Sequence, residues 1–273
     1  MAIVWVDKMV VDVRGEGDAV VCVHGLGGSM NAWTPLLPAL QRHRVLRVEL
    51  PGAGRSRRAY ALGDRDAVGG KLAIEQHVQA VLRVCSVLGV ARAHFVGHSL
   101  GTIVCQHLAV AAPKLVRSLA LLGPLMALPE TARAALRVRA AKARSEGAAG
   151  MHDISLALVN SALSTDTRQR QPLAVAFVRE SLMRQEPDNY ARTIDALVAA
   201  QPAALDAITA PVLLLTGDDD GVAPPQAVRA MAERFHRSVN VRVQVYTHCG
   251  HWTPVERSAE CQSDLAAFLS AQR

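Results

Sequence analysis

The chain has 273 residues, half of them hydrophobic and a fifth charged. It is therefore long and apolar enough to bury a sizeable core, which excludes an intrinsically disordered chain. The formal net charge of +6 comes from arginines spread along the chain, without a recognisable nucleic-acid-binding module, so we expect a solvated basic surface and no nucleic-acid partner. The alternative use of this charge is attraction of anionic substrates.

The cysteines and the N-terminus bear on where the protein works. The five cysteines form an odd set without CxxC or CxxH spacing, and reduced thiols are typical of the cytoplasm. The apolar run at residues 1–6 is too short for a signal peptide or a membrane span. We therefore expect a cytoplasmic protein with no membrane partner, while formation of a homo-oligomer stays open.

The first part of the chain alternates strand-like and helical patterns. Short apolar runs typical of strands occupy Ile3–Val6, Met9–Val13, Ala19–His24, Val45–Leu50, Ala93–Val96 and Val116–Leu122. Apolar residues at helical spacing occupy Glu75–Leu88 and Thr102–Ala111. This order of strands and helices predicts a parallel sheet with right-handed crossovers and helices on both faces.

The middle of the chain has a different pattern. From Pro124 to Leu205 we find no strand, and amphipathic helical segments occupy Glu130–Glu146, Asp153–Leu163, Pro172–Gln185 and Asn189–Ala200. The alternation then resumes with strands at Val212–Thr216 and Val239–Tyr246 and helices at Pro225–Phe235 and Ser258–Gln272. We therefore predict an α/β core domain at 1–123 and 206–273 and a helical cap, or lid, at 124–205.

A nucleophile is expected at Ser99. The residues at 97–101 match the G-x-S-x-G pattern, between a predicted strand and a predicted helix. A serine at the apex of a tight strand-to-helix turn needs small residues two positions away on either side, and Gly97 and Gly101 supply them. The helix N-terminus also directs free N–H groups toward developing negative charge.

The glycine-rich loop at 24–28 follows a predicted central strand. A tetrahedral intermediate needs two N–H donors around its oxygen, and the backbone N–H groups of Leu26 and Leu100 are the candidates for this oxyanion hole. A dinucleotide site would need G-x-G-x-x-G and a phosphate-binding P-loop would need Gly-Lys-Ser/Thr, and neither pattern occurs here. The remaining alternative is a plain glycine turn.

A base and an acid are expected after the second set of strands. His251 lies in the loop that follows the predicted strand at 239–246, with His248 as the alternative base. One carboxylate of the Asp218–Asp220 run should hold the imidazole in its productive tautomer, and Asp220 is the choice. Such a run can also be a polar turn, and no nearby histidine or further acid completes a metal site there.

These motifs, in this order, resemble the α/β-hydrolase superfamily over nearly the whole chain. The matching segments are His-Gly-x-Gly-Gly at 24–28, the D-x-x-G-x-G-x-S segment at 49–56 with Glu49 in place of Asp, G-x-S-x-G at 97–101, G-x-x-D-x-x-x-P at 217–224, and Gly250, His251, Pro254 and Glu256. The resemblance implies the α/β-hydrolase fold: a mostly parallel eight-stranded sheet flanked by helices, with a helical cap insertion. It also selects Asp220 over its neighbours.

The cap sequence is similar to that of 3-oxoadipate enol-lactonases and related small carboxylesterases. The similarity rests on Glu146-Gly147, Arg170-x-Pro172, Asn189-Tyr190-Ala191-Arg192 and Ile208-x-Ala210-Pro211. The resemblance implies hydrolysis of a small-molecule ester or lactone through an acyl-enzyme, with Ser99, His251 and Asp220 as a catalytic triad and without a cofactor or metal. Cleavage of a C–C, amide or thioester bond, perhydrolysis, and a non-catalytic ligand receptor on the same fold remain alternatives.

The substrate pocket is expected beyond the carboxyl ends of the strands, under the cap. Its candidate walls are Trp33, Met126, Leu128, Tyr190 and Trp252, for which ordinary core packing is the alternative. A cap arginine, Arg133 or Arg137, could bind a substrate carboxylate, or could belong to a solvated helix face.

Overall fold

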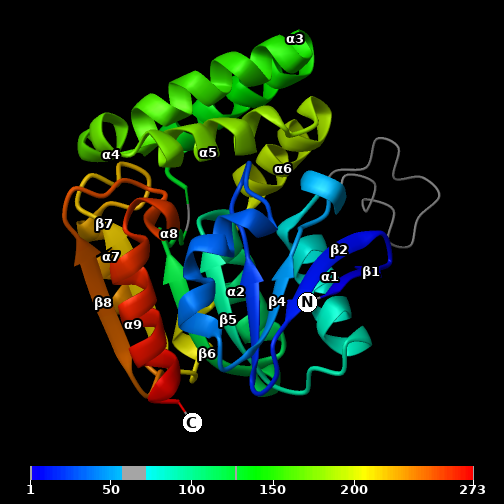
Figure 1. Cartoon of the computed structure of the whole chain (residues 1–273), viewed down its shortest axis with the longest axis vertical. Helices are drawn as coiled ribbons and strands as arrows, with labels where there is room; N and C mark the ends of the chain where they lie inside the picture. Colours follow the sequence, from blue (N-terminus) through cyan, green and yellow to red (C-terminus); the bar gives the residue numbers. More distant parts are fainter. Residues whose placement is uncertain (1, 57–71, 127, 273) are drawn as a thin grey trace.

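An eight-stranded sheet runs through the centre of the molecule. The computed structural model describes residues 2–56, 72–126 and 128–272. The sheet has the order β1-β2-β4-β3-β5-β6-β7-β8. Its strands are β1 (Ala2–Val6), β2 (Met9–Arg14), β3 (Ala19–Val23), β4 (Arg44–Val48), β5 (Ala93–His98), β6 (Val116–Leu122), β7 (Val212–Gly217) and β8 (Val241–Tyr246). Figure 1 shows β8 at one edge and the β1–β2 hairpin at the other.

The direction of each strand follows from its sequence. The strands from β4 to β8 in the sheet order pair in parallel, and every residue of β3, β5 and β7 is buried. Continuous apolar runs suit strands that are covered on both faces. Only β2 pairs antiparallel, with β1 and β4, after a two-residue turn at Asp7 and Lys8. The prediction of a mostly parallel eight-stranded sheet flanked by helices is confirmed.

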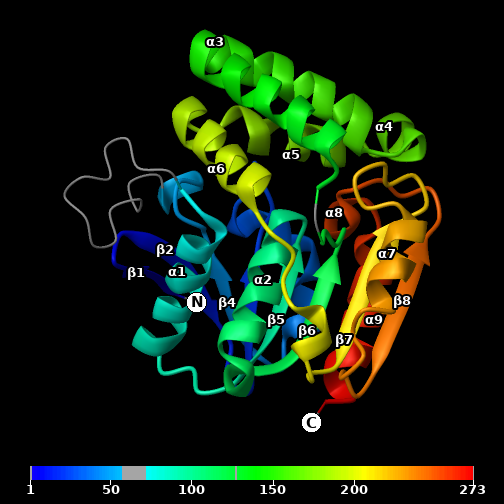
Figure 2. The same ribbon diagram turned by 180° about the vertical axis from the view of Figure 1, so that it is seen from behind.

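Helices cover both faces of the sheet. The helices α1 (Ile74–Val87) and α2 (Leu100–Ala111) contact each other on one face, together with α7 (Pro225–Ala232). The 3₁₀ segment η1 (Met30–Leu40) and α9 (Ser258–Ser270) contact each other on the other face. Figures 1 and 2, seen from opposite sides, show these two layers in turn. Each layer has its own apolar cluster, separated by the sheet.

Four α-helices of the described part of the chain lie between β6 and β7 and form a layer over the carboxyl ends of the parallel strands (Figures 1 and 2). They are α3 (Glu130–Ala162), α4 (Thr165–Arg170), α5 (Pro172–Met183) and α6 (Pro187–Ala199). We call this layer the cap. Its helix α3 packs against α5 and α6. This layer therefore faces the end of the sheet where the nucleophile turn is expected.

Some local predictions differ from the structure. The two helices expected at 130–146 and 153–163 are joined in α3, with a kink at Gly147, whose φ of 58° and ψ of −130° are not helical. A glycine adopts this conformation without the steric cost that other residues meet, so the chain turns there and resumes the helix. The short helices α4 and α8 (Thr253–Glu256) and the segment η1, which contains two prolines, were not expected.

Two further features are the absence of a membrane-spanning helix from the described residues and the burial of the cysteines. None of the helices within the described ranges is long and apolar enough to cross a bilayer. All five cysteines are buried and unpaired, and burial raises the pKa of the Cys22 thiol to about 12. These thiols behave as small apolar side chains in the two core clusters.

Candidate active site

Ser99 stands at the turn between β5 and α2. Its backbone has a φ of 52° and a ψ of −120°, a conformation that costs a non-glycine residue free energy. The turn is held because Ser99 N–H donates to the Leu122 carbonyl oxygen at 2.9 Å. A side-chain carbon added to Gly101 would lie 2.0 Å from the Val23 carbonyl oxygen, so only glycine fits where α2 begins beside β3. The strained turn thus projects the Ser99 hydroxyl away from the sheet.

His251 and Asp220 reach Ser99 from the loops after β8 and β7. The Ser99 Oγ lies 2.8 Å from His251 Nε2, and His251 Nδ1 lies 2.9 Å from Asp220 Oδ2 and 3.1 Å from Oδ1. With Nδ1 protonated toward the carboxylate, Nε2 is free to accept the hydroxyl proton. The structure therefore brings the three predicted residues into one hydrogen-bonded line.

The electrostatics of this line favour an ionised acid and a basic imidazole. Burial lowers the pKa of His251, but the Asp220 carboxylate outweighs it and holds the pKa above the usual histidine value. Burial raises the pKa of Asp220, but His251 and the backbone N–H groups of Val222 and Ala223 hold it below the usual value. Both N–H groups donate to Asp220 Oδ1 at 2.8 Å. At neutral pH Asp220 is thus an anion fixed in place.

A buried carboxylate holds the loop that carries His251. The Glu256 side chain, 3% exposed, accepts hydrogen bonds from the backbone N–H groups on both sides of His251. Gly250 N–H donates to Oε2 at 3.0 Å and Trp252 N–H to Oε1 at 3.0 Å. The N–H of Ser164, in the cap, donates to Oε2 at 2.9 Å. Glu256 therefore fixes the backbone on both sides of His251 and links this loop to the cap.

His98 supports the same loop from the nucleophile side. Burial lowers the pKa of His98 to about 3, so the ring is neutral at physiological pH. Its Nε2–H donates to the His251 carbonyl oxygen at 2.8 Å, and the two rings lie 5.3 Å apart. In the sequence, His98 is only a variable position of G-x-S-x-G. No local pattern signals its contact with residue 251, which is 153 positions away in the chain.

The glycine-rich loop after β3 lies beside Ser99. A carbon added to Gly25 would be 2.8 Å from Ser99 Cβ. His24 stiffens the loop, because its Nδ1–H donates to the Gly25 carbonyl oxygen at 2.8 Å and its Nε2 accepts the Leu50 N–H at 3.1 Å. The N–H groups of Leu26 and Leu100 have no acceptor within the part of the chain that the structure describes. Both are thus available to a ligand.

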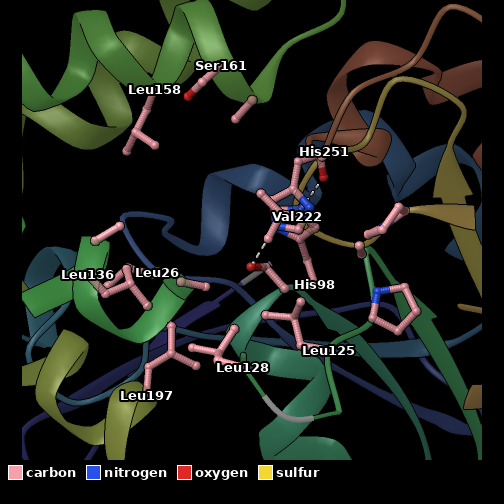
Figure 3. Close-up of a pocket in the computed structure, with 18 of the residues that line it drawn as sticks. Leu26, His98, Leu125, Leu128, Leu136, Leu158, Ser161, Leu197, Val222 and His251 are labelled. Carbon is pink, nitrogen blue, oxygen red and sulfur yellow. Dashed lines mark hydrogen bonds between the residues drawn. The ribbon is translucent and has the colours of Figure 1, made fainter. Parts of the chain in front are cut away.

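A cavity of about 570 Å³ opens above Ser99 and His251, between the core and the cap. Figure 3 shows Leu136, Leu158 and Leu197, from α3 and α6, around the space that His251 faces. Of the predicted wall residues, Met126, Leu128, Tyr190 and Trp252 line it, as does Leu26. The walls are mainly aliphatic, so the cavity suits an apolar ligand of small-molecule size.

The expectation for Trp33 is wrong. Trp33 is part of η1, and its side chain is fully buried in the apolar cluster between the sheet and the layer of η1 and α9, with Leu36, Leu40 and Phe268. It is not among the residues that line the cavity. The 3₁₀ segment η1 turns the tryptophan down onto the sheet, so a position just after the glycine-rich loop does not bring the side chain to the ligand.

Of the two alternatives for Arg133 and Arg137, the structure does not support a contact with the substrate. The Arg133 guanidinium donates to the carbonyl oxygens of Leu128, Val198 and Ala200. Arg137 pairs with Glu130 at 2.6 Å, and both side chains are more than half exposed. Neither arginine lines the cavity, whereas Arg139 does. The phase of α3 relative to α6 decides which arginine faces inward, and the helical pattern alone does not define that phase.

The alternatives to Asp220 and His251 lie elsewhere. Asp218 and Asp219 are exposed, and Asp218 Oδ1 accepts the Cys249 N–H at 3.1 Å. His248 is exposed, and its carbonyl oxygen accepts a hydrogen bond from Ser164. Across residues 2–56, 72–126 and 128–272, no group of three or more His, Cys, Asp or Glu side chains is placed to hold a metal ion.

Comparisons with known proteins agree with this architecture. A family model described as the alpha/beta hydrolase fold matches residues 18–258. A protein of Stutzerimonas stutzeri that carries the name carbamate hydrolase RutD is 29% identical over 270 residues, 95% of each chain. The 2-hydroxymuconate semialdehyde hydrolase of a Pseudomonas strain is 27% identical over 94% of this chain and 88% of its own. The solved enol-lactonase of Burkholderia xenovorans is similar with a TM-score of 0.81 and 26% identity, over 98% of this chain and all of that one.

Proposed function

Because the chain belongs to the α/β-hydrolase fold family, we propose that it is a serine hydrolase that cleaves a carboxylic ester or lactone of a small molecule. The observation that carries this proposal is the hydrogen-bonded line from Ser99 through His251 to Asp220, at the floor of a cavity. A serine hydroxyl is too weakly acidic to attack a carbonyl unaided, and this line supplies the base that it needs.

Acylation begins with attack of Ser99 Oγ on the substrate carbonyl carbon. His251 Nε2, 2.8 Å away, takes the hydroxyl proton as the new C–O bond forms. The Asp220 carboxylate stabilises the imidazolium that results. His251 then gives this proton to the leaving oxygen, which departs as an alcohol or, for a lactone, stays attached as the free hydroxyl end of the acyl group.

The negative charge of the tetrahedral intermediate needs preorganised donors. Leu26 follows Gly25, which lies against Ser99, and Leu100 directly follows Ser99; neither backbone N–H has a partner in the described chain. In this mechanism both donate to the oxyanion. Losing one donor of such a pair slows the chemical step by about 100- to 1000-fold in comparable enzymes, because the charge then forms in an apolar cavity with half its compensation.

Deacylation repeats the same steps with water. His251 takes a proton from a water molecule, which attacks the acyl carbonyl, and returns the proton to Ser99 Oγ as the ester bond to the enzyme breaks. The products are a carboxylic acid and the regenerated serine. No cofactor takes part in this sequence, which we propose on the residues of the chain alone.

The type of bond rests on the relatives. One relative is named as an enol-lactonase and another as a carbamate hydrolase, so the carbonyl group is shared while the leaving group differs. The mainly aliphatic cavity of about 570 Å³ suits a small ester or lactone. Cleavage of a C–C, amide or thioester bond with the same three residues is the alternative, and a substrate panel separates these reactions.

The test is active-site labelling followed by turnover. We expect a fluorophosphonate to modify Ser99 in the wild type, identified by peptide mass mapping, and not in Ser99→Ala. We also expect hydrolysis of p-nitrophenyl acetate and butyrate that falls by several orders of magnitude in the variant. A folded wild-type protein with neither adduct nor turnover would overturn the proposal and leave a ligand receptor on this fold.

A further inference from the structure

The cavity above Ser99 is lined by one arginine and by no acidic side chain of the described residues. Apart from the histidines, Arg139 is the one charged side chain among the described residues that line it. No aspartate or glutamate in the described chain contacts this cavity. A guanidinium stays protonated at every physiological pH. An apolar cavity with a lone cation is therefore electrostatically suited to an anion.

Arg139 has no carboxylate partner in the described chain. The acidic residues of the neighbouring helix α6 are already paired, Asp188 with Arg192 at 2.9 Å and Asp195 with Arg144. The one side-chain interaction of Arg139 found among the described residues is with the Tyr190 hydroxyl, whereas Arg133 and Arg137 are bonded to groups outside the cavity. The Arg139 side chain is half-buried and lines the cavity, so its charge is open to a ligand there.

Tyr190 provides a buried hydroxyl donor in the same place. The side chain is 2% exposed, lines the cavity, and has no acceptor for its hydroxyl proton among the described residues. Burial raises the pKa of this phenol, and the nearby Arg139 guanidinium opposes the increase. The ring also lies against the loop after β3, since a carbon added to Gly27 would be 3.4 Å from Tyr190 Cε2. The two donors are thus next to the loop that borders Ser99.

We propose that Arg139 and the Tyr190 hydroxyl bind a carboxylate at the far end of the substrate, so that the enzyme hydrolyses esters or lactones that carry a second, free carboxylate. This inference rests on the proposed hydrolysis at Ser99. A half-buried cation without a carboxylate partner and a buried hydroxyl without an acceptor together lack what a carboxylate has: two acceptor oxygens and one negative charge. A single guanidinium balances a carboxylate monoanion, whereas a phosphate dianion would keep half its charge uncompensated.

The test uses ester pairs that differ in charge and not in shape. Monomethyl succinate, glutarate and adipate carry the carboxylate, and the matching methyl ketone esters, such as methyl 5-oxohexanoate for glutarate, replace it with a neutral acetyl group. Hydrolysis is followed by release of methanol. For at least one pair we expect wild-type kcat/KM to favour the carboxylate ester by about 10- to 100-fold, the range of a charge-assisted contact.

The variants assign this preference to the two side chains. We expect Arg139→Met to lower kcat/KM far more for the carboxylate ester than for its neutral partner, so that the preference is lost, and Tyr190→Phe to reduce the preference several-fold. Arg137→Met, two residues away on the exposed face of α3, should keep it in full. Equal losses on both members of a pair in Arg139→Met, or a wild type without preference in any pair, would overturn the inference.

A binding measurement separates this inference from the proposed function. Glutarate is titrated into Ser99→Ala, with and without Arg139→Met, by calorimetry. Binding that needs Arg139, together with a folded wild type that hydrolyses none of the esters, would keep the carboxylate site and overturn the proposed hydrolysis. Hydrolysis of the neutral esters without carboxylate preference, together with no binding of glutarate, would overturn the carboxylate site and leave the proposed hydrolysis standing.

Discussion

At the scale of single residues, the proposed chemistry depends on the protonation state of His251. The base must be neutral to accept the Ser99 proton, and Asp220 holds the pKa of His251 above the usual value despite burial. Activity is therefore present above this raised pKa and is lost as the pH falls through it. We expect the acidic limb of kcat/KM for p-nitrophenyl butyrate to have its midpoint above about 6.5, the ordinary histidine value. A midpoint at or below 6.5 would contradict this assignment of the base.

The neighbouring carboxylate of Glu256 adds to this effect. It raises the pKa of His251 through its charge, after the larger contribution of Asp220, and it accepts three backbone N–H groups. Glutamine is neutral and has one acceptor oxygen, so in Glu256→Gln at least one of these N–H groups faces an amide nitrogen. We expect the acidic limb to move to lower pH, kcat to fall about tenfold, and unfolding free energy to drop by about 1–3 kcal/mol.

Glu260→Gln is the matched control, because Glu260 is exposed on the first turn of α9 and should change none of these quantities. The position of the limb is the deciding measurement. A variant that loses stability but keeps the wild-type limb would show that Glu256 holds the loop without influencing His251.

The residues that sequence patterns identified and those they missed differ in one respect. Ser99, His251 and Asp220 are each marked by a motif at a strand end, and parallel strands bring their carboxyl ends to one edge of the sheet. Arg139 has no motif, since its role depends on how α3 packs against α6. Trp33 was expected in the pocket wall, yet its ring is fully buried in the apolar cluster between η1 and the sheet. Motifs predict backbone positions well, whereas side-chain direction depends on packing between elements.

At the scale of elements, the junction of β5 and α2 concentrates strain at the nucleophile. Ser99 has a positive φ. An alanine at this position would be strained in the same way, whereas a glycine adopts such a φ freely. Ser99→Ala and Ser99→Gly both lack the hydroxyl, so they differ in stability and not in chemistry. Glycine relieves the backbone strain, but it also loses more chain entropy on folding, which offsets part of the gain. We expect the free energy of unfolding of Ser99→Gly, measured by urea denaturation, to exceed that of Ser99→Ala by about 1 kcal/mol. An alanine variant of equal or greater stability would show that the turn is unstrained.

The elements of the core could be predicted from the sequence more fully than those of the cap. The strands β3, β5 and β7 are buried on both faces, so their sequences are continuous apolar runs that permit few other readings. The break expected between two cap helices became a kink within α3, because Gly147 turns the backbone at one residue. Helical periodicity reports which residues share a face and does not report where a helix bends.

At the scale of the whole molecule, the cap is bonded to the loop that carries the base. His251 N–H donates to the Ala162 carbonyl oxygen at 2.7 Å, at the end of α3. Ser164 Oγ–H donates to the His248 carbonyl oxygen at 2.7 Å, and Ser164 N–H donates to Glu256. These contacts join the cap to the base on one side of the cavity. A shift of the cap would therefore disturb the position of His251 as well as the shape of the cavity.

On the other side of the cavity, Arg133 closes the cap on itself. Its guanidinium donates to Leu128, just before α3, and to Val198 and Ala200, at the end of α6. These are the points where the chain enters and leaves the cap. Arg133→Met keeps much of the aliphatic stem but leaves three carbonyl oxygens without this donor. We expect faster backbone hydrogen exchange in residues 128–200, with unchanged exchange in the core strands β3 and β5.

The same variant should raise KM for neutral esters several-fold and change kcat little, because a looser cap weakens binding while Ser99, His251 and Asp220 stay hydrogen-bonded through the core loops. Arg137→Met removes an arginine four residues along the same helix that pairs with exposed Glu130, and should leave both exchange and KM at wild-type values. If exchange rose equally in cap and core, Arg133 would be stabilising the whole fold. If it rose in neither, the bonds to Val198 and Ala200 would not hold the cap closed.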